Sequence, residues 1–210
     1  MSTVLLFLGL PGSGKGTQAS ILCQRLNIKS YSLGDILRVY ARSEAIDSEL
    51  VKNLLDNGEV VPANIVNKIV ADILLNGEKL CILDGYPRTM EQADFLSKFQ
   101  NLLVVPIYFN LSAEMIVDRI LNRVQCVKCN KVYSSDVLVC EKCESKDFYI
   151  RDDDNRSIIN KRITEFNRNT LPVLDFYNKV DLLNEIDAST GVEQISQKLN
   201  CILERLRIDF

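Results

Sequence analysis

The segment that most constrains the fold is a glycine-rich run near the N-terminus, residues 9–17, with the sequence GLPGSGKGT. An apolar stretch at 4–8, typical of a strand, precedes it, and a stretch with helical periodicity follows. Glycines at such a junction let the backbone wrap around phosphate oxygens with its N–H groups pointing inward, and the helix adds the positive end of its dipole. The sequence therefore predicts a strand, a phosphate-binding loop and a helix, in that order.

Two charged side chains near this loop suit a phosphate site. Lys15 supplies a positive charge for the β- and γ-phosphates of a nucleotide. Thr17 offers a hydroxyl one place after the position that usually serves Mg²⁺, which Gly16 occupies here. Asp84 follows the apolar run at 80–83, and a carboxylate at the end of a parallel strand beside such a loop is well placed to hold Mg²⁺, directly or through water.

Short apolar runs alternate with helical patterns along the rest of the chain. Five runs predict strands, at 4–8, 29–32, 80–84, 104–110 and 180–187. Among the helical patterns between them, one is expected to run to about 124 and another from 155 to 178. Strands separated by helices are typical of a parallel sheet with helices on both faces. We therefore expect an α/β fold with a five-stranded parallel sheet of the type that carries phosphate loops.

Two segments interrupt the alternation and are expected to project from the core. Residues 31–61 hold two short helical patterns, and residues 122–162 include a stretch without helical periodicity at 126–149. The core then consists of residues 1–30, 62–121 and 163–210. One core with two insertions is in keeping with a length of 210 residues.

The second insertion carries four of the seven cysteines, as two Cys-x-x-Cys pairs separated by ten residues: Cys126, Cys129, Cys140 and Cys143. Each pair directs two thiolates to one point, and two pairs complete the tetrahedron that Zn²⁺ prefers. Four protein ligands leave no open position, so the zinc would be structural and not catalytic. The alternatives are an iron–sulfur cluster and two disulfides, and an odd number of cysteines without an export signal disfavours the disulfides.

The composition excludes several classes of function. The chain has no histidine, which rules out Ser-His-Asp and Cys-His nucleophiles and histidine-ligated metals. Its net charge of −3 argues against a dedicated nucleic-acid binder. The longest apolar run, at 102–109, contains a proline and is too short to cross a membrane. We therefore expect a cytoplasmic protein that binds small molecules.

Several short motifs resemble those of the adenylate kinases, a family of nucleoside monophosphate kinases, in the same order and at matching intervals. They are GLPGSGKGTQ at 9–18, SLGDILR at 32–38, DGYPRT at 84–89, VDRILNR at 117–123, RDDDN at 151–155 and KR at 161–162. The four cysteines make the chain most similar to bacterial members with a long, zinc-binding lid. The resemblance implies reversible phosphoryl transfer from MgATP to AMP, giving two ADP, by a monomer.

The resemblance also implies which residues bind the two nucleotides. The donor ATP would be held by Gly12, Ser13, Gly14, Lys15, Gly16, Thr17, Arg119 and Arg123. The acceptor AMP would be held by Ser32, Leu33, Gly34, Arg38, Leu55, Val60, Val61, Gly85, Arg88, Gln92, Arg151 and Arg162. Residues 31–61 would then be the monophosphate-binding insertion. Residues 122–162 would form a zinc-ribbon-like lid, and we call this segment the lid below.

The implied catalytic residues are almost all positively charged: Lys15, Arg88, Arg119, Arg123, Arg151 and Arg162, together with Asp84. Their type agrees with the chemistry, because phosphoryl transfer between two nucleotides brings two polyanions together and depends on positioning and charge compensation. The acceptor is already an anionic phosphate oxygen, so no general base is needed. Asp153 and Asp154 would help the lid to close in this family.

The acceptor base is the least constrained part of the prediction. The amide of Gln92 can donate and accept hydrogen bonds side by side, which matches the edge of adenine. Leu33 and Glu59 depart from the threonine and lysine frequent at these positions in adenylate kinases. A pyrimidine monophosphate as acceptor and GTP as donor are therefore alternatives. A zinc-ribbon ATPase that binds nucleic acid is a remote one, since four lysines are balanced by four acidic residues at 126–148.

Overall fold

Five parallel strands form the central sheet of the computed structural model, which describes residues 2–77 and 79–208. They are β1 (Ser2–Leu8), β2 (Lys29–Ser32), β3 (Leu80–Asp84), β4 (Leu102–Asn110) and β8 (Asn184–Asp187), in the order β2-β3-β1-β4-β8. The predicted α/β fold is confirmed. The last strand is shorter than the predicted 180–187, because Leu182 donates its N–H to the carbonyl of Tyr177 in a turn that ends the preceding helix.

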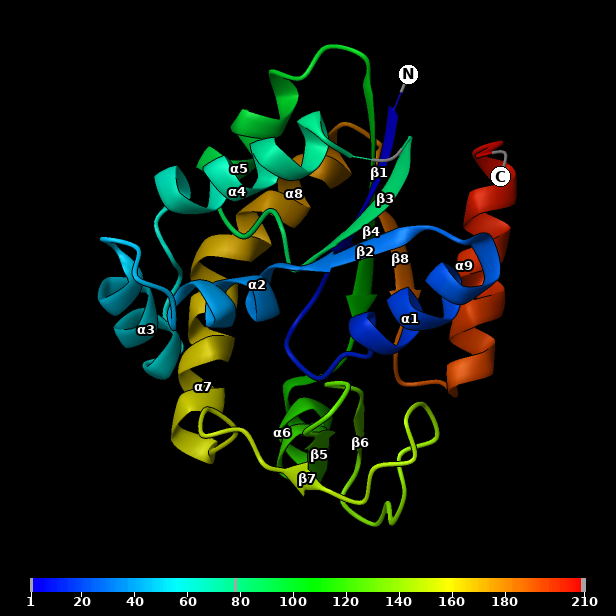
Figure 1. The fold of residues 1–210 in the computed structure, drawn as a ribbon. Coiled ribbons are helices and arrows are strands. Elements are labelled where there is room, and N and C mark those ends of the chain that lie inside the picture. The colour runs from blue at the N-terminus through cyan, green and yellow to red at the C-terminus, as the bar shows by residue number, and fades with distance from the viewer. Residues whose placement is uncertain (1, 78, 209–210) are drawn as a thin grey trace.

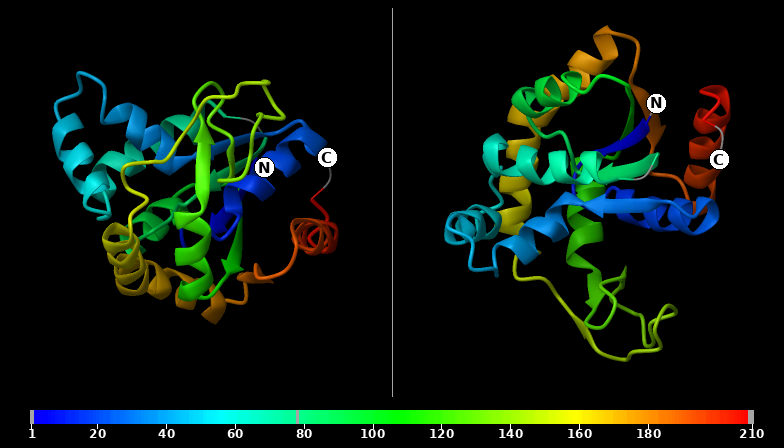
Figure 2. Two further views of the ribbon diagram at one scale, coloured as in Figure 1. Left: turned by 90° about the horizontal axis from the view of Figure 1, so that it is seen from below. Right: turned by 45° about the horizontal axis from the view of Figure 1, so that its top comes forward.

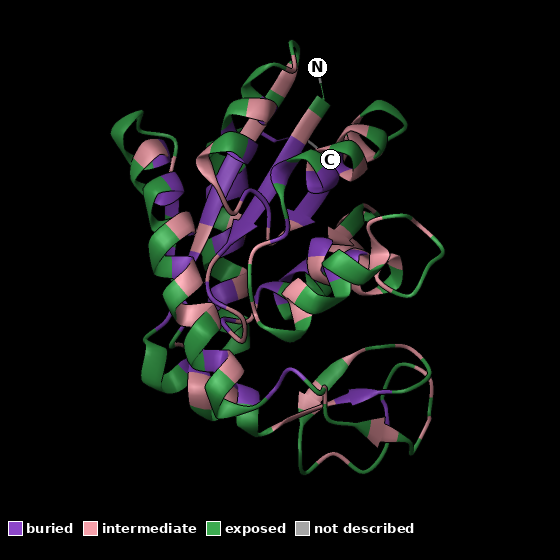
Figure 3. Ribbon diagram, turned by 90° about the vertical axis from the view of Figure 1, so that its left-hand side faces the viewer, coloured by how far each residue is buried: buried purple, intermediate pink, exposed green. Residues whose placement is uncertain are grey.

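Helices cover both faces of the sheet, as Figure 1 and Figure 2 show. One layer holds α1 (Lys15–Leu26) and α9 (Val192–Arg205), and the other holds α4 (Ala63–Leu75), α5 (Met90–Ser97) and α8 (Leu171–Lys179). The central strand β1 is covered from both sides, so that Val4, Leu5, Leu6 and Phe7 are completely buried (Figure 3). This burial on both faces explains why the strand is a continuous apolar run in the sequence.

The first projecting segment contains two short helices, as predicted for residues 31–61. They are α2 (Leu33–Tyr40) and α3 (Ser48–Asp56), which lie to one side of the sheet in Figure 1. The side chain of Ser32 caps α2 by accepting the N–H of Asp35. Leu33, Leu37 and Val51 are buried and anchor the two helices on the core.

One long helical rod connects the lid to the core. It consists of α7 (Arg156–Glu165), a π-helical segment η1 (Phe166–Thr170) and α8, coloured from yellow to orange in Figure 1. The helix predicted at 155–178 is therefore confirmed, except for the widened turn in its middle. There Leu171 donates its N–H to the carbonyl of Phe166, five residues earlier.

The lid contains a small antiparallel sheet, made of β5 (Arg123–Cys126), β6 (Val132–Ser134) and β7 (Phe148–Tyr149) in the order β6-β5-β7. The helix expected to run to about 124 is shorter: α6 (Ala113–Leu121) ends because Arg123 already pairs with Ser134 across the lid sheet. Within the described ranges, no helix is long and apolar enough to span a membrane.

Candidate active site

The candidate site lies at the carboxyl edge of the central sheet, where the phosphate loop leads from β1 into α1. The strand register pairs Phe7 of β1 with Asp84 of β3, which brings the Asp84 carboxylate beside the loop. A Cβ atom on Gly16 would lie 3.6 Å from Asp84 Oδ2. The carboxyl edge of a parallel α/β sheet is where such folds bind ligands.

Three glycines of the loop adopt backbone conformations that other residues rarely take. Gly9 has φ 143°, Gly12 has φ 82° and Gly14 has φ 93°. A Cβ on Gly9 would lie 2.7 Å from the carbonyl oxygen of Phe109, and one on Gly12 would lie 2.9 Å from Ile120 Cγ1. The loop is thus packed tightly against β4 and α6. Gly14 is the N-cap of α1 and has no side chain to bind the first N–H groups of the helix, which leaves them for an anion.

Lys15 folds into this loop. Its Nζ donates to the carbonyls of Gly9 and Leu10, both at 2.9 Å, and the side chain is buried. Burial lowers the pKa of Lys15 to about 8, although Asp84 opposes that shift. A buried ammonium that is partly satisfied by backbone carbonyls is poised to exchange them for phosphate oxygens, which would stabilise its charge.

Asp84 is the carboxylate that could hold a divalent cation. Burial raises its pKa, and Lys15 and Arg88 oppose the shift. A cation at this carboxylate would offset its desolvation and favour the ionised form. Gly16, in the exposed first turn of α1, lies next to Asp84, and a carboxylate oxygen is a ligand that Mg²⁺ prefers.

Arg88 also interacts electrostatically with Asp84. Its Nε donates to the carbonyl of Gly85 at 3.0 Å, and its backbone N–H donates to Oε1 of Gln92 at 2.7 Å. Burial, together with the neighbouring charges of Arg162 and Arg38, lowers its pKa to about 10. Positive groups therefore converge here without enough protein anions to neutralise them, which favours binding of a phosphate.

An apolar pocket opens beside Arg88. It is lined by Leu33, Gly34, Leu37, Leu55, Val60, Val61, Val66, Gly85, Arg88 and Gln92. Most of these residues were predicted to bind the acceptor, and the structure brings them together from α2, α3, α4, α5 and the segments that follow α3 and β3. Val66 was missed, because its spacing on α4 is that of an ordinary core position. Leu33 forms part of the wall, whereas Glu59 is exposed and does not line the pocket.

Several arginines of the site form ion pairs with aspartates. Arg123 forms a bidentate pair with Asp154, with both N–O distances at 2.7 Å. Arg38 binds Asp153 at 3.0 Å and Asp35 at 3.0 Å, and Arg162 also binds Asp153. The sequence identified the arginines, but the pairing of Arg38 with Asp153, 115 residues apart, depends on the fold.

Asp153 is the centre of this network. It is 8% exposed, and its Oδ1 atom has no hydrogen-bond partner among the described residues. Burial disfavours its charge, but Arg162 and Arg38 outweigh that effect and lower its pKa to about 2. The carboxylate therefore holds the two arginines at the point where the lid, α2 and α7 meet.

Three other predicted residues are less central. Arg151 of the lid contacts Gln125 Oε1 and, at 3.4 Å, Asp35. Arg119 on α6 donates to the carbonyl of Ala188 at 3.0 Å and contacts no carboxylate among the described residues. Ser32 serves as the N-cap of α2.

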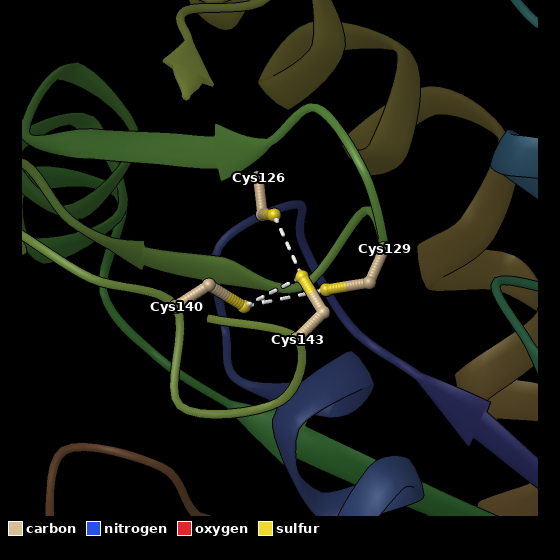
Figure 4. A group of neighbouring side chains, drawn as sticks. All are labelled: Cys126, Cys129, Cys140 and Cys143. Atoms are coloured by element: carbon tan, nitrogen blue, oxygen red, sulfur yellow. Dashed lines mark hydrogen bonds between the residues drawn. The ribbon is translucent and has the colours of Figure 1, made fainter. Parts of the chain in front are cut away.

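The four cysteines of the lid converge on one point, as Figure 4 shows. Their Sγ atoms all lie within 4.8 Å of one another, with the Cys126–Cys143 pair at 3.5 Å and the Cys129–Cys140 pair at 3.4 Å. A disulfide would need about 2.05 Å. In a zinc tetrahedron with Zn–S bonds of about 2.3 Å the sulfurs are about 3.8 Å apart. The arrangement therefore fits Zn²⁺ better than two disulfides.

The two Cys-x-x-Cys segments have the same local structure. In the first, Asn130 donates its N–H to the carbonyl of Cys126, and in the second Glu144 donates to that of Cys140. Both Asn130 and Glu144 have φ 59°, in the left-handed region. Tyr133 adds a hydroxyl 3.2 Å from Cys140 Sγ. Two equivalent turns that face each other make a ready-formed tetrahedral site.

Comparison with known proteins agrees with this geometry. The family model described as adenylate kinase matches residues 7–182. The adenylate kinase of Orientia tsutsugamushi (strain Ikeda) is 39% identical over 210 residues, covering 96% of this chain and 97% of that protein. The adenylate kinase of Rickettsia africae (strain ESF-5) is 35% identical over 209 residues, covering 96% and 99%.

Proposed function

This chain belongs to the adenylate kinase family and catalyses ATP + AMP to two ADP, and from that premise we propose how its residues divide the reaction. The observation that carries the assignment is the meeting of two anion sites at one carboxylate. Lys15 of the phosphate loop and Arg88 beside the apolar pocket both interact with Asp84 and with each other electrostatically. A donor phosphate at Lys15 and an acceptor phosphate at Arg88 would therefore lie next to each other.

The phosphate loop forms the donor end. The N–H groups at residues 12–17 and the ammonium of Lys15 would bind the β- and γ-phosphates of ATP. Asp84 would hold Mg²⁺, and the hydroxyl of Thr17 in the first turn of α1 would be a further oxygen ligand. Bound Mg²⁺ neutralises charge on the phosphate oxygens, and the chain itself keeps Lys15 and Asp84 in place through β1 and β3.

The pocket beside Arg88 forms the acceptor end. Its apolar walls would enclose the base, and Arg88 and Arg38 would bind the monophosphate. Because Oε1 of Gln92 accepts the N–H of Arg88, base recognition falls mainly to the Nε2 group of the amide, which is a donor. Adenine offers a ring nitrogen acceptor on its pairing edge for this donor, and its amino group can donate to the second lone pair of Oε1. Uracil and guanine present the reverse order at these two positions, an N–H and a carbonyl, so the amide favours AMP over UMP and GMP.

The remaining arginines would stabilise the transferring group. Arg119, Arg123, Arg151 and Arg162 would exchange their carboxylate and carbonyl partners for phosphate oxygens as the lid closes. The positive charge then lies around the equatorial oxygens of the transferring phosphoryl group, over which negative charge is spread in the transition state. Closure also keeps water out, so that ATP is not hydrolysed instead.

The lid would be held together by Zn²⁺ bound to Cys126, Cys129, Cys140 and Cys143. Four thiolates leave no position for substrate, so the zinc supplies stability and no step of the reaction. The residues between the ligands are mostly exposed, which leaves a segment of this length without an apolar core of its own.

We also propose that the enzyme works as a monomer in the cytoplasm. The complete site, from the phosphate loop to the lid arginines, comes from one chain. A reducing compartment keeps thiols available for zinc. Light scattering of the purified protein should give the mass of a single chain with and without nucleotides.

The acceptor and donor assignments are tested by a coupled assay with MgATP and each of AMP, CMP, UMP and GMP. We expect kcat/KM to be highest for AMP, with UMP and GMP lowest. A preference for UMP or CMP would make the chain a pyrimidine monophosphate kinase on the same fold. Release of phosphate from ATP without transfer to any acceptor would overturn the kinase assignment.

A further inference from the structure

The backbone of Arg88 is held on both sides by side chains from other parts of the fold. Its N–H is bound by Gln92 Oε1 at 2.7 Å, and its carbonyl accepts a hydrogen bond from Thr170 Oγ1 at 3.0 Å. Thr170 lies 82 residues further along the chain and is only 4% exposed. With Nε bound to the carbonyl of Gly85, Arg88 has little freedom to change its position.

Thr170 departs from the usual behaviour of threonine in a helix. A helical threonine hydroxyl commonly donates to a carbonyl of its own helix, three or four residues earlier. Thr164 on α7 does this, with a 3.1 Å bond to the carbonyl of Asn160. Thr170 instead crosses to another element of the structure, and the group that it reaches is the backbone of the acceptor arginine.

The π-helical segment explains how Thr170 faces Arg88. Arg162 on α7 and Thr170 are eight positions apart, so a regular α-helix would place them about 80° apart around its axis. The extra residue in η1 changes the angle between the two side chains by about 100° in the opposite sense. The two side chains therefore point within about 20° of the same direction. Both do act on one residue, since Arg162 repels the Arg88 guanidinium and Thr170 binds its carbonyl.

We propose that Thr170 is a positioning residue for phosphoryl acceptance, which fixes Arg88 through its backbone carbonyl. This inference rests on the proposed role of Arg88 in binding the acceptor phosphate. Arg162 and Thr170 belong to one helical rod. Arg162 contacts the lid carboxylate Asp153, and Thr170 binds Arg88 at the acceptor site, so the π segment between them connects the two contacts. Arg88 and Arg162, the last residue of the lid, are thereby held in a defined relation while the rest of the lid moves.

The test compares Thr170→Val, which keeps the shape but removes the hydroxyl, with Thr170→Ser, which keeps the hydroxyl. We expect Thr170→Val to raise KM for AMP about tenfold and to leave KM for ATP within about twofold, because a buried carbonyl loses its donor. Thr170→Ser should stay within about threefold of the parent. Thr164→Val is the matched control, and it should leave both constants unchanged, since its hydroxyl bonds only within α7.

A double-mutant cycle with Arg88→Ala separates positioning from general stability. Without the guanidinium there is nothing to position, so Thr170→Val should have almost no further effect on KM for AMP. An equal tenfold loss in both backgrounds, or equal losses for AMP and ATP, would overturn the inference. If Arg88→Ala itself leaves KM for AMP unchanged, the proposed role of Arg88 fails instead. Thr170→Ala against Thr170→Ser decides the question if the valine variant does not fold.

Discussion

The phosphate loop and the lid present charged groups to the same site, but they are stabilised in different ways. The loop rests on completely buried strands, so that Lys15 and Asp84 are held by a hydrophobic core. In the lid, the buried residues at 123–150 are Gln125, Cys126 and Cys140, and several apolar residues are exposed, with Leu138 at 82%. A segment without a core depends on its metal ligands, and this lets the lid move without disturbing the sheet.

The largest effect on catalysis is expected from the loop, with none on the fold. Lys15→Ala should lower kcat by about 10³-fold, because a preorganised positive charge on the phosphates is lost. Unfolding followed by circular dichroism should show no loss of stability, since burial of this ammonium is unfavourable. Retention of more than about a tenth of the parent activity would contradict the assignment, and Lys98→Ala, at an exposed lysine, is the control.

The pH dependence of stability sharpens this prediction. The pKa of Lys15 is about 8 in the folded chain and 10.5 for an ordinary lysine. Between these values the unfolded chain binds more protons, so the stability of the parent should rise with pH in this window. Lys15→Ala should lack this rise. The same slope in both proteins would show that Lys15 is not buried in solution.

The opposite pattern is expected in the lid, where stability changes more than chemistry. Cys129→Ser should release zinc and lower the melting temperature by about 5–10 °C, with activity falling about tenfold as the lid loses its shape. Amide exchange should increase in the lid and stay unchanged in β1. Cys201→Ser, at an exposed cysteine on α9, is the matched control. An unchanged zinc content and melting curve would show that zinc bound by Cys129 does not stabilise the lid.

The smallest effect is expected where the two regions meet. The pKa of Asp153 is about 2 in the folded chain, against 3.8 for an ordinary aspartate, so its pairing with Arg162 and Arg38 stabilises the fold above about pH 4 and is lost as the pH falls through 2. Asp153→Asn should remove about 1–2 kcal/mol of this pH-dependent stability, after allowance for solvent screening. Asp152→Asn, at the exposed neighbour, should keep the parent slope. If Asp153→Asn also keeps it, the pair does not form in solution.

Much of the site was predictable because its signals are local. The strand, loop and helix around Lys15 follow from adjacent residues, and so do the two turns that place Cys126 and Cys140. The apolar positions at 33, 55, 60 and 61 were predicted by resemblance, and the structure places all of them around one pocket. The two Cys-x-x-Cys pairs predicted a zinc-ribbon-like lid, but not the bounds of its three strands, because these are two to four residues long and have too little alternation to detect.

Other features depend on distances that the sequence does not contain. Nothing near Thr170 indicates that its hydroxyl leaves its own helix, and nothing near Gln92 shows that its carbonyl oxygen is already engaged by Arg88. The sequence does not indicate the π segment either, since one extra residue in a turn leaves the helical pattern on both sides intact.

By itself, the sequence determined the chemistry: a phosphate loop, an arginine array without a general base and a four-thiolate site, since each needs particular residue types at short spacings. The tertiary structure decided which partners those groups have. Arg38 meets Asp153 across 115 residues, and Arg88 meets Thr170 across 82. Such pairs form where helices and lid pack together, because hydrogen bonds act over about 3 Å and only the folded chain brings distant residues that close.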